Sequence, residues 1–261
     1  GFTMIQSLKE IYSYKEMIRN MVRKDLRGRY KGSVLGFFWT ILNPILQLLV
    51  YTFLFSVVLK TGIDKYYLFL FVALVPWIFF SSCLVGGSGI ILGQKDLVKK
   101  IYFPIEVLPI CHVTSNFINM LLSFIVIFAV VIISGSKITY AALYLPVVMI
   151  IEYIFALGVA YISSAITVYF RDMEQILGIA GMAWMYLTPV MYSVDMIPEE
   201  FYGVLTANPM SPIILAYRDV LYYGKVPEAT GLLTSFLLGV IILVAGFALF
   251  NKLKRRFVEE L

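Results

Sequence analysis

The chain has 261 residues, of which 61% are hydrophobic and only 14% are charged. Soluble domains are about half apolar and about a quarter charged, so this composition and a mean hydropathy of +0.88 predict a single all-helical domain that crosses a membrane several times. The net charge of +5 does not indicate a nucleic-acid partner, because the basic residues gather at the ends of apolar segments.

The first segment, residues 1–33, is expected to lie on the membrane surface at its cytoplasmic side. Apolar residues from Ile5 to Leu26 recur at steps of three and four, which predicts one amphipathic helix. Five basic residues and one acid then stand between Val22 and Ser33. A basic amphipathic helix just before a span favours the membrane interface, with its cations facing anionic headgroups. Contact with a cytoplasmic protein is the other role open to it.

Six apolar segments between residues 34 and 250 are long enough to cross a bilayer, which takes about 20 residues of helix. They are residues 34–59, 66–92, 105–134, 141–170, 174–194 and 230–250. A basic tail, residues 251–261, follows the last one. Segments assigned to the cytoplasm hold sixteen of the twenty-one basic residues, and this bias predicts that both termini are cytoplasmic.

Two of the segments that connect the predicted spans differ from the spans in amino-acid composition. Residues 93–104 predict a short polar cytoplasmic helix between a glycine and a proline. Residues 195–229 contain four prolines and predict short helices that re-enter the outer leaflet without crossing it, where protein covers their backbone. Gly224 is expected to end the second of these helices.

Catalytic and metal-binding motifs are absent from the sequence. It has no GxxxxGK[ST] phosphate loop, no cluster of metal-ligand residues with suitable spacing and no hydrolase or zinc-protease motif. We therefore expect no catalytic residue, no metal and no cofactor in this chain. Cys83 and Cys111 lie in apolar runs and are expected to be buried thiols. His112, the only histidine, is expected to have a packing or interfacial role.

Glu152 is the one acidic residue well inside a predicted span. Intramembrane acids commonly have a function, so a proton-coupled secondary transporter that uses Glu152 is an alternative hypothesis. A structural glutamate is the other interpretation, because no basic residue lies deep in another span to pair with it. A membrane enzyme that acts on lipid-linked sugars would need clustered acids or a metal motif, which the chain lacks.

Aromatic residues make up 16% of the chain, and several lie deep in predicted spans. Aromatic faces suit the C–H surfaces of sugars, and tyrosine adds a hydroxyl group for hydrogen bonds. A path for a glycan and ordinary packing are both consistent with their positions. The candidates for such a path are Tyr51, Phe55, Trp77, Trp184 and Tyr186.

Four groups of residues resemble the membrane subunit of bacterial polysaccharide ABC exporters. The first is the pattern R-x-x-Y-K-x-S-x-L-G-x-x-W-x-x-x-x-P, which runs from Arg27 to Pro44. The others are Y-F-R-D-M-E-Q-I at residues 169–176, L-T-P-V-M-Y at residues 187–192, and N-P-M-S-P-I-I at residues 208–214, with Arg218 following. This family exports lipid-linked O-antigen, and exporters of capsule and teichoic acid are its close relatives.

The resemblance implies a homodimer of six-span subunits in the bacterial inner membrane, with two cytoplasmic ATPase subunits that bind ATP and magnesium. The implied cargo is an undecaprenyl-linked O-antigen polysaccharide, with capsule or teichoic acid as the alternative. The resemblance further implies ATPase contacts from the first helix and residues 93–104. The implied coupling residues are Lys95, Asp96, Lys99, Lys100, Arg171 and Asp172. The implied gate residues, in the re-entrant helices, are Pro198, Pro209, Pro212 and Arg218.

Overall fold

The computed structural model describes residues 4–261, in which helices are joined by short turns and loops and no strand occurs. Five helical segments are long and apolar enough to cross a membrane: Gly36–Val58, Tyr66–Gly86, Val107–Ile133, Tyr140–Tyr169 and Ala229–Glu260. The α-helices are α1 (Met4–Ser13), α2 (Lys15–Gly28), α3 (Trp39–Thr52), α4 (Tyr66–Ser81), α5 (Ile90–Gly93), α6 (Lys95–Lys100), α7 (Val107–Ile133), α8 (Leu145–Tyr169), α9 (Met173–Leu187), α10 (Tyr202–Ala207), α11 (Met210–Arg218), α12 (Ala229–Leu253) and α13 (Phe257–Glu260).

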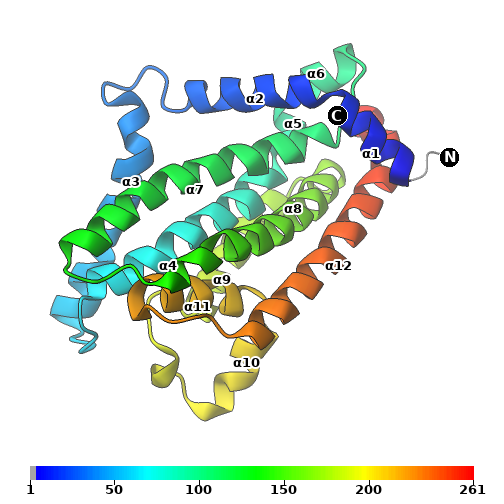
Figure 1. Cartoon of the computed structure of the whole chain (residues 1–261). Coiled ribbons are helices and arrows are strands. Elements are labelled where there is room, and N and C mark those ends of the chain that lie inside the picture. The colour runs from blue at the N-terminus through cyan, green and yellow to red at the C-terminus, as the bar shows by residue number, and fades with distance from the viewer. Residues whose placement is uncertain (1–3) are drawn as a thin grey trace.

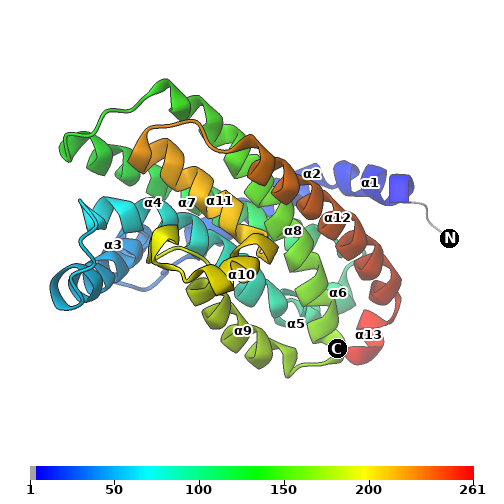
Figure 2. The same cartoon turned by 90° about the horizontal axis from the view of Figure 1, so that it is seen from below.

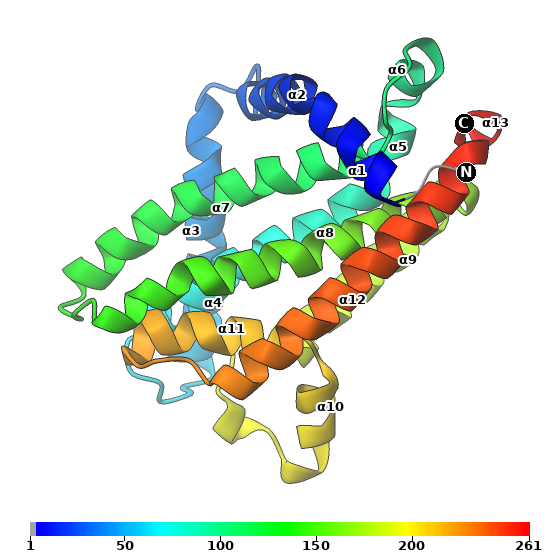
Figure 3. The same cartoon turned by 45° about the vertical axis from the view of Figure 1, so that its right-hand side comes forward.

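The long helices form a bundle with distinct ends (Figure 1). Helices α1, α6 and α13 gather at one end, which we call the α6 end. Helix α10 and the start of α12 lie at the other, which we call the α10 end. The C-terminus and the first described helix therefore lie at the same end of the bundle, as Figure 3 also shows.

Helix α4 is the centre of the bundle. It is apolar on every side, as a fully buried helix must be, and 78% of its most apolar stretch is buried. The first span, Gly36–Val58, is only 11% buried and stands at the edge of the bundle (Figure 2). Most of the apolar surface of α3 is therefore left for lipid or for another protein chain.

Two helices, α1 and α2, take the place of the single amphipathic helix that we expected. They meet at Tyr14, whose φ of −97° and ψ of 19° depart from helical values. The Ser13 hydroxyl donates to the carbonyl oxygen of Glu10, a local bond that competes with helix continuation. Part of the apolar stripe is buried, with Ile11 and Val22 in the core, whereas Ile5 and Leu8 on α1 are exposed. Helix α2 lies across α7 (Figure 1).

The fifth predicted span is shorter than the sequence suggested. We expected a helix over residues 174–194, but α9 has only 15 residues and ends at Leu187. The cause is Pro189, because the residue before a proline is driven out of the helical region, and Thr188 is extended at φ −98° and ψ 138°. At a rise of about 1.5 Å per residue, α9 is about 22 Å long.

Breaks in the other helices occur at residues with positive φ and at π-helical turns. The first span begins at Gly36 rather than Val34, because Tyr30, Gly32 and Gly36 adopt positive φ values and turn the chain. Helices α3, α4 and α11 each run into a π-helical turn, at Phe53–Val58, Ser82–Gly86 and Asp219–Tyr223. Gly224 ends the last of these at φ +67°, as predicted.

Helices α8 and α12 approach so closely that their backbones touch. A Cβ atom at Gly158 of α8 would lie 2.7 Å from the backbone nitrogen of Leu243, and one at Gly246 of α12 would lie 2.7 Å from the carbonyl oxygen of Gly158. Small residues allow this approach between helices in a membrane. The pair fixes the position of the last span against the core.

We expect Gly158→Ala to separate α8 from α12, because the contacting atoms belong to a backbone that cannot move aside. Overpacking of this kind costs about 1–3 kcal/mol. The matched control is Gly203→Ala in α10, where the new Cβ atom would meet no atom of the described chain within 4 Å. Thermal unfolding in detergent measures both, and equal midpoints would contradict the expectation.

Candidate functional site

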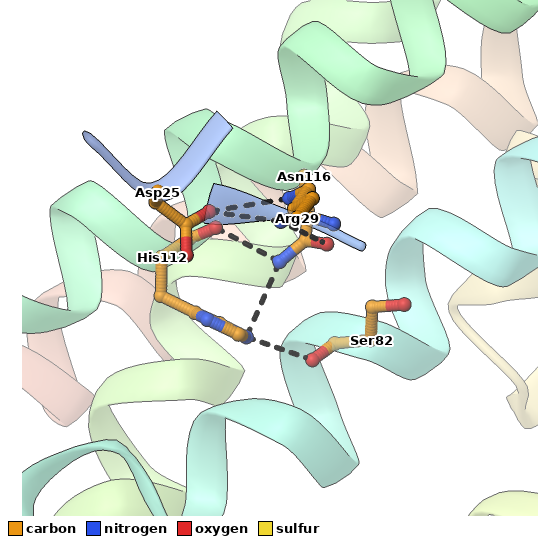
Figure 4. A network of polar contacts seen from close by, with 5 residues as sticks. All are labelled: Asp25, Arg29, Ser82, His112 and Asn116. Atoms are coloured by element: carbon orange, nitrogen blue, oxygen red, sulfur yellow. Dashed lines mark hydrogen bonds and ion pairs between the residues drawn. The ribbon is translucent and has the colours of Figure 1, made fainter. Parts of the chain in front are cut away.

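A polar network joins α2 to α7 and to the π-helical turn after α4 (Figure 4). Arg29 contacts the Asp25 carboxylate at 3.1 Å and donates to the Asn116 side-chain oxygen at 3.1 Å. The Nε2 atom of His112 lies 3.0 Å from the Ser82 carbonyl oxygen and 3.2 Å from Asn116 Nδ2. The Ser82 carbonyl oxygen can only accept a hydrogen bond, so we assign the His112 proton to Nε2, where it donates to Ser82. Asn116 Nδ2 donates to the His112 carbonyl oxygen.

This network is a mechanical connection between the surface helix and the bundle. Its partners come from positions as far apart as Arg29 and Asn116, and Asn116 is buried. A displacement of α2 therefore acts on α7, and through His112 on the distorted turn after α4. The contacts of His112 with Ser82 and Asn116 favour the packing or interfacial role expected for it (Figure 4).

A polar cavity of about 160 Å³ lies next to the network, between α3, α4 and α7. Arg29 and Tyr30 stand in its wall. Thr40 Oγ1 and Asn119 Oδ1 are buried without a hydrogen-bond partner in the described chain, and both residues line the cavity. Because buried polar groups are normally paired, the cavity suits ordered water or a polar ligand group.

The aromatic residues proposed for a glycan path lie in different surroundings. Trp77 is buried, and its ring stands 6.4 Å from that of Trp184. Trp184 packs edge-on against Phe80 at 4.8 Å and donates from Nε1 to a side-chain oxygen. These contacts favour a packing role for both tryptophans. Tyr186 is 54% exposed on α9. A glycan path lined by these residues remains a prediction, and it depends more on Tyr186 than on the two tryptophans.

Two further path candidates lie near the α10 end of the first span. Phe55 stacks on Tyr66 with ring centroids 5.9 Å apart, and both Phe55 and Tyr51 are half-buried. Tyr66 in turn donates its hydroxyl proton to the Met191 carbonyl oxygen at 2.6 Å. Phe55 therefore anchors the first span to α4, while Tyr51 keeps an accessible edge.

Arg218, proposed as a gate residue, is buried at 1% exposure. Its guanidinium group donates to the Pro189 carbonyl oxygen at 2.6 Å, to that of Val190 at 2.5 Å and to that of Phe69 at 3.2 Å. It also lies 3.6 Å from the centroid of the Phe69 ring, a cation–π contact. Arg218 thus joins α11, α4 and the turn that follows α9.

Asn208 joins the end of α9 to the start of α11 through a second set of hydrogen bonds. Its side chain accepts from Trp184 Nε1 at 2.7 Å and donates to Thr188 Oγ1 at 2.8 Å. The Pro209 carbonyl oxygen accepts from Ser235 at 2.8 Å, which brings in α12. These contacts of Asn208 were not predicted from the sequence, although Asn208 belongs to the N-P-M-S-P-I-I group and Thr188 to the L-T-P-V-M-Y group. Pro198 is exposed, and Pro212 is half-buried at the start of α11.

Glu152 is buried in α8 and accepts a hydrogen bond from the Tyr217 hydroxyl at 2.9 Å. Its second oxygen has no partner in the described chain. A charged carboxylate here would be unpaired, and an unpaired buried charge is very costly. The arrangement favours the structural interpretation of Glu152, with Tyr217 as the partner that the sequence did not identify.

The residues predicted to contact an ATPase are all exposed at the α6 end. They are Lys95, Asp96, Lys99, Lys100, Arg171 and Asp172. Helix α6 stands clear of the bundle (Figure 3). The turn between α8 and α9 reaches α13, where Arg171 donates to the Glu260 carbonyl oxygen at 3.4 Å. The structure therefore brings these separate segments to one end.

Two polar contacts hold the α6 end together. Lys254 pairs with Glu106, whose side chain is almost fully buried, and this pair ties the end of α12 to the start of α7. The Tyr102 hydroxyl donates to Glu10 at 2.9 Å, and this hydrogen bond to a carboxylate raises the pKa of Tyr102 above its usual value. Cys83 and Cys111 are buried free thiols.

Known proteins are similar to this chain over most of its length. The model of a family described as ABC-2 type transporter matches residues 16–222. An O-antigen export system permease protein RfbA from Myxococcus xanthus is 35% identical over 99% of this chain and 100% of its own length. One from Klebsiella pneumoniae is 35% identical over 92% and 93%. The polysialic acid transport protein KpsM of Escherichia coli is 23% identical over 91% and 93%.

We expect Arg218→Met to destabilise the protein by about 3 kcal/mol, because three buried carbonyl groups would lose their donor. The control is Lys225→Met, which removes the exposed partner of a long, partly exposed ion pair with Asp219 and should cost about 1 kcal/mol or less. Thermal unfolding of the detergent-purified chain measures both. A change at Arg218 no larger than the change at Lys225 would contradict the role assigned to it.

Proposed function

The chain belongs to the ABC-2 type transporter family, and on this premise we propose that it is the membrane subunit of an exporter of undecaprenyl-linked O-antigen polysaccharide in the bacterial inner membrane. The observation that carries the proposal is the near full-length similarity to proteins named O-antigen export permeases. A capsule or teichoic-acid exporter of the same family is the alternative. The greater distance of KpsM favours O-antigen over capsule.

We propose that α9 is the fifth of six spans and that both termini are cytoplasmic. The chain leaves α8 at the α6 end, where Tyr169 donates to the Leu253 carbonyl oxygen. It begins α12 at the opposite end (Figure 1). The intervening chain must therefore cross the bundle once, and α9 is the segment that does so. The α6 end is then cytoplasmic, and α10 and α11 face the periplasm as gate helices.

The functional unit is a homodimer whose polysaccharide path runs between the two subunits. Within residues 4–261, the buried side chains of α4 fill the middle of the bundle, which supports a path between subunits rather than inside one. The apolar residues on the outside of α3 and α9 support a partner surface there. On α9 the exposed ones are Ile176, Ile179, Met182, Tyr186 and Leu187. Figure 2 places both helices at the edge of the bundle, away from α12.

Energy for export comes from a separate ATPase subunit that binds ATP and magnesium. The exposed residues of α6 and of the α8–α9 turn form the surface on which two such subunits dock, one on each protomer. Movement of the docked ATPase is passed to α2 and α7 by the contacts at the α6 end. This chain itself supplies the path and performs no covalent chemistry.

Charge reversal at Lys99 and Lys100 tests the docking surface. We expect Lys99→Glu with Lys100→Glu to weaken co-purification of the ATPase at least tenfold, because an acidic α6 would repel the surface that its cations contact. Membrane insertion should be unaffected. The control is Lys137→Glu, an exposed change between α7 and α8. Unchanged ATPase recovery in the double variant would remove α6 from the interface.

Reconstitution tests the function and separates it from proton-coupled transport. We expect liposomes containing the chain and its ATPase to move lipid-linked O-antigen only when ATP is hydrolysed. Glu152→Gln should retain most of this flux, because the amide oxygen can still accept the Tyr217 hydroxyl proton. If the chain purifies alone, supports ion-driven flux and loses it in Glu152→Gln, the secondary-transporter alternative replaces the proposal.

A further inference from the structure

A pocket of about 610 Å³ opens where α2, the loop before α3 and α7 meet. Five cationic side chains line it: Arg19, Arg23, Arg27, Arg29 and Lys31. No acidic side chain is found among the described residues that form its wall. The positive charge of residues 1–33 is therefore concentrated around one hollow rather than spread along a helix.

Apolar side chains make up much of the rest of the pocket wall. Val22 and Leu26 come from α2, Ile118 from α7 and Phe37 from the start of the first span. Helical spacing explains the combination, because the α2 residues of the pocket recur at steps of three and four on one face. A ligand that fits this pocket carries an anionic group and an apolar chain together.

Three of the five cations have no partner of their own. Arg19 contacts Glu16 at 3.0 Å, and Arg29 is held by Asp25 and Asn116. The side chains of Arg23, Arg27 and Lys31 form no ion pair within residues 4–261. Arginine and lysine are the residues that bind phosphate in proteins, arginine through paired hydrogen bonds.

The loop that closes the pocket is held in an unusual conformation. Tyr30 has a φ of +59°, which is rare for a residue with a side chain, and Gly32 follows at +88°. Such backbone strain persists mainly at functional sites. The turn brings Lys31 into the same wall as the α2 arginines.

We propose that this pocket binds the phosphate headgroup of a membrane lipid, with the lipid chain against Val22, Leu26 and Phe37. If the proposed function holds, its occupant is the diphosphate of the lipid-linked cargo, so this second part rests on that function. Arg29 lines both this pocket and the polar cavity behind it. A bound phosphate would then share Arg29 with Asp25 and reach the network in Figure 4.

The test measures binding of a fluorescent polyprenyl diphosphate to the full chain in phosphatidylcholine nanodiscs. We expect the triple variant Arg23→Gln, Arg27→Gln and Lys31→Gln to bind at least tenfold more weakly. The matched control, Lys9→Gln, Lys15→Gln and Lys24→Gln, removes three charges from α1 and α2 outside the pocket and should bind as the native chain does. The milder pair Arg23→Lys and Arg27→Lys keeps the charges and should bind better than the triple variant.

Each outcome bears on the proposal. Equal binding by the pocket variant and the native chain overturns it, and so does an equal loss in both triple variants, because that indicates only diffuse attraction. If phosphatidylglycerol in the nanodisc displaces the diphosphate at comparable concentration, the phosphate site stands and a bilayer lipid is its occupant. Since binding requires no ATPase, failure of ATP-driven export would overturn the proposed function and leave the phosphate site intact.

Discussion

One buried cation, the guanidinium group of Arg218, fixes the relation between the helices at the α10 end. It satisfies the carbonyl groups of Pro189 and Val190, where the chain has left regular helix and cannot satisfy them itself, and it also donates to the carbonyl group of Phe69 within α4. A membrane interior offers no water to replace such a donor. The end of α9, the position of α11 and the entry into α12 all depend on it. A short, irregular segment can be buried within the bundle because this cation donates to its carbonyl groups.

Local signals account for most of the helices, and interactions between distant residues account for what the sequence did not predict. Runs of apolar residues located five segments that are long enough to span a membrane. Gly224 marked the end of the π-helical turn that continues α11, because glycine adopts a positive φ without strain. Pro189 is evident in the sequence as a residue that can end α9. The carbonyl groups beyond the end of the helix also need a hydrogen-bond donor, and Arg218 provides it from a position 29 residues away. No periodic pattern in the sequence indicates that Arg29 pairs with Asn116 or that Glu152 pairs with Tyr217.

The two ends of the protein are stabilised by different physical means. At the α10 end, buried hydrogen bonds from Arg218 and Asn208 leave few alternative arrangements. At the α6 end, the contacts are mostly partly exposed, such as that of Tyr102 with Glu10. Partly exposed polar contacts open at low cost. The α6 end can therefore adjust to a partner while the opposite end keeps its geometry.

The shortness of α9 has a consequence for the surrounding lipid. A helix of about 22 Å is shorter than the hydrocarbon core of a bilayer, which is about 30 Å thick. Lipid thins beside a short helix, or the flanking residues reach toward the headgroups, at a modest free-energy cost for each ångström. With α9 as the proposed fifth span, the bilayer next to it would be thinner than elsewhere, and a polar chain that passes there would cross less hydrocarbon. Hydrophobic mismatch would thus lower the barrier to the passage of a sugar polymer along this side of the protein.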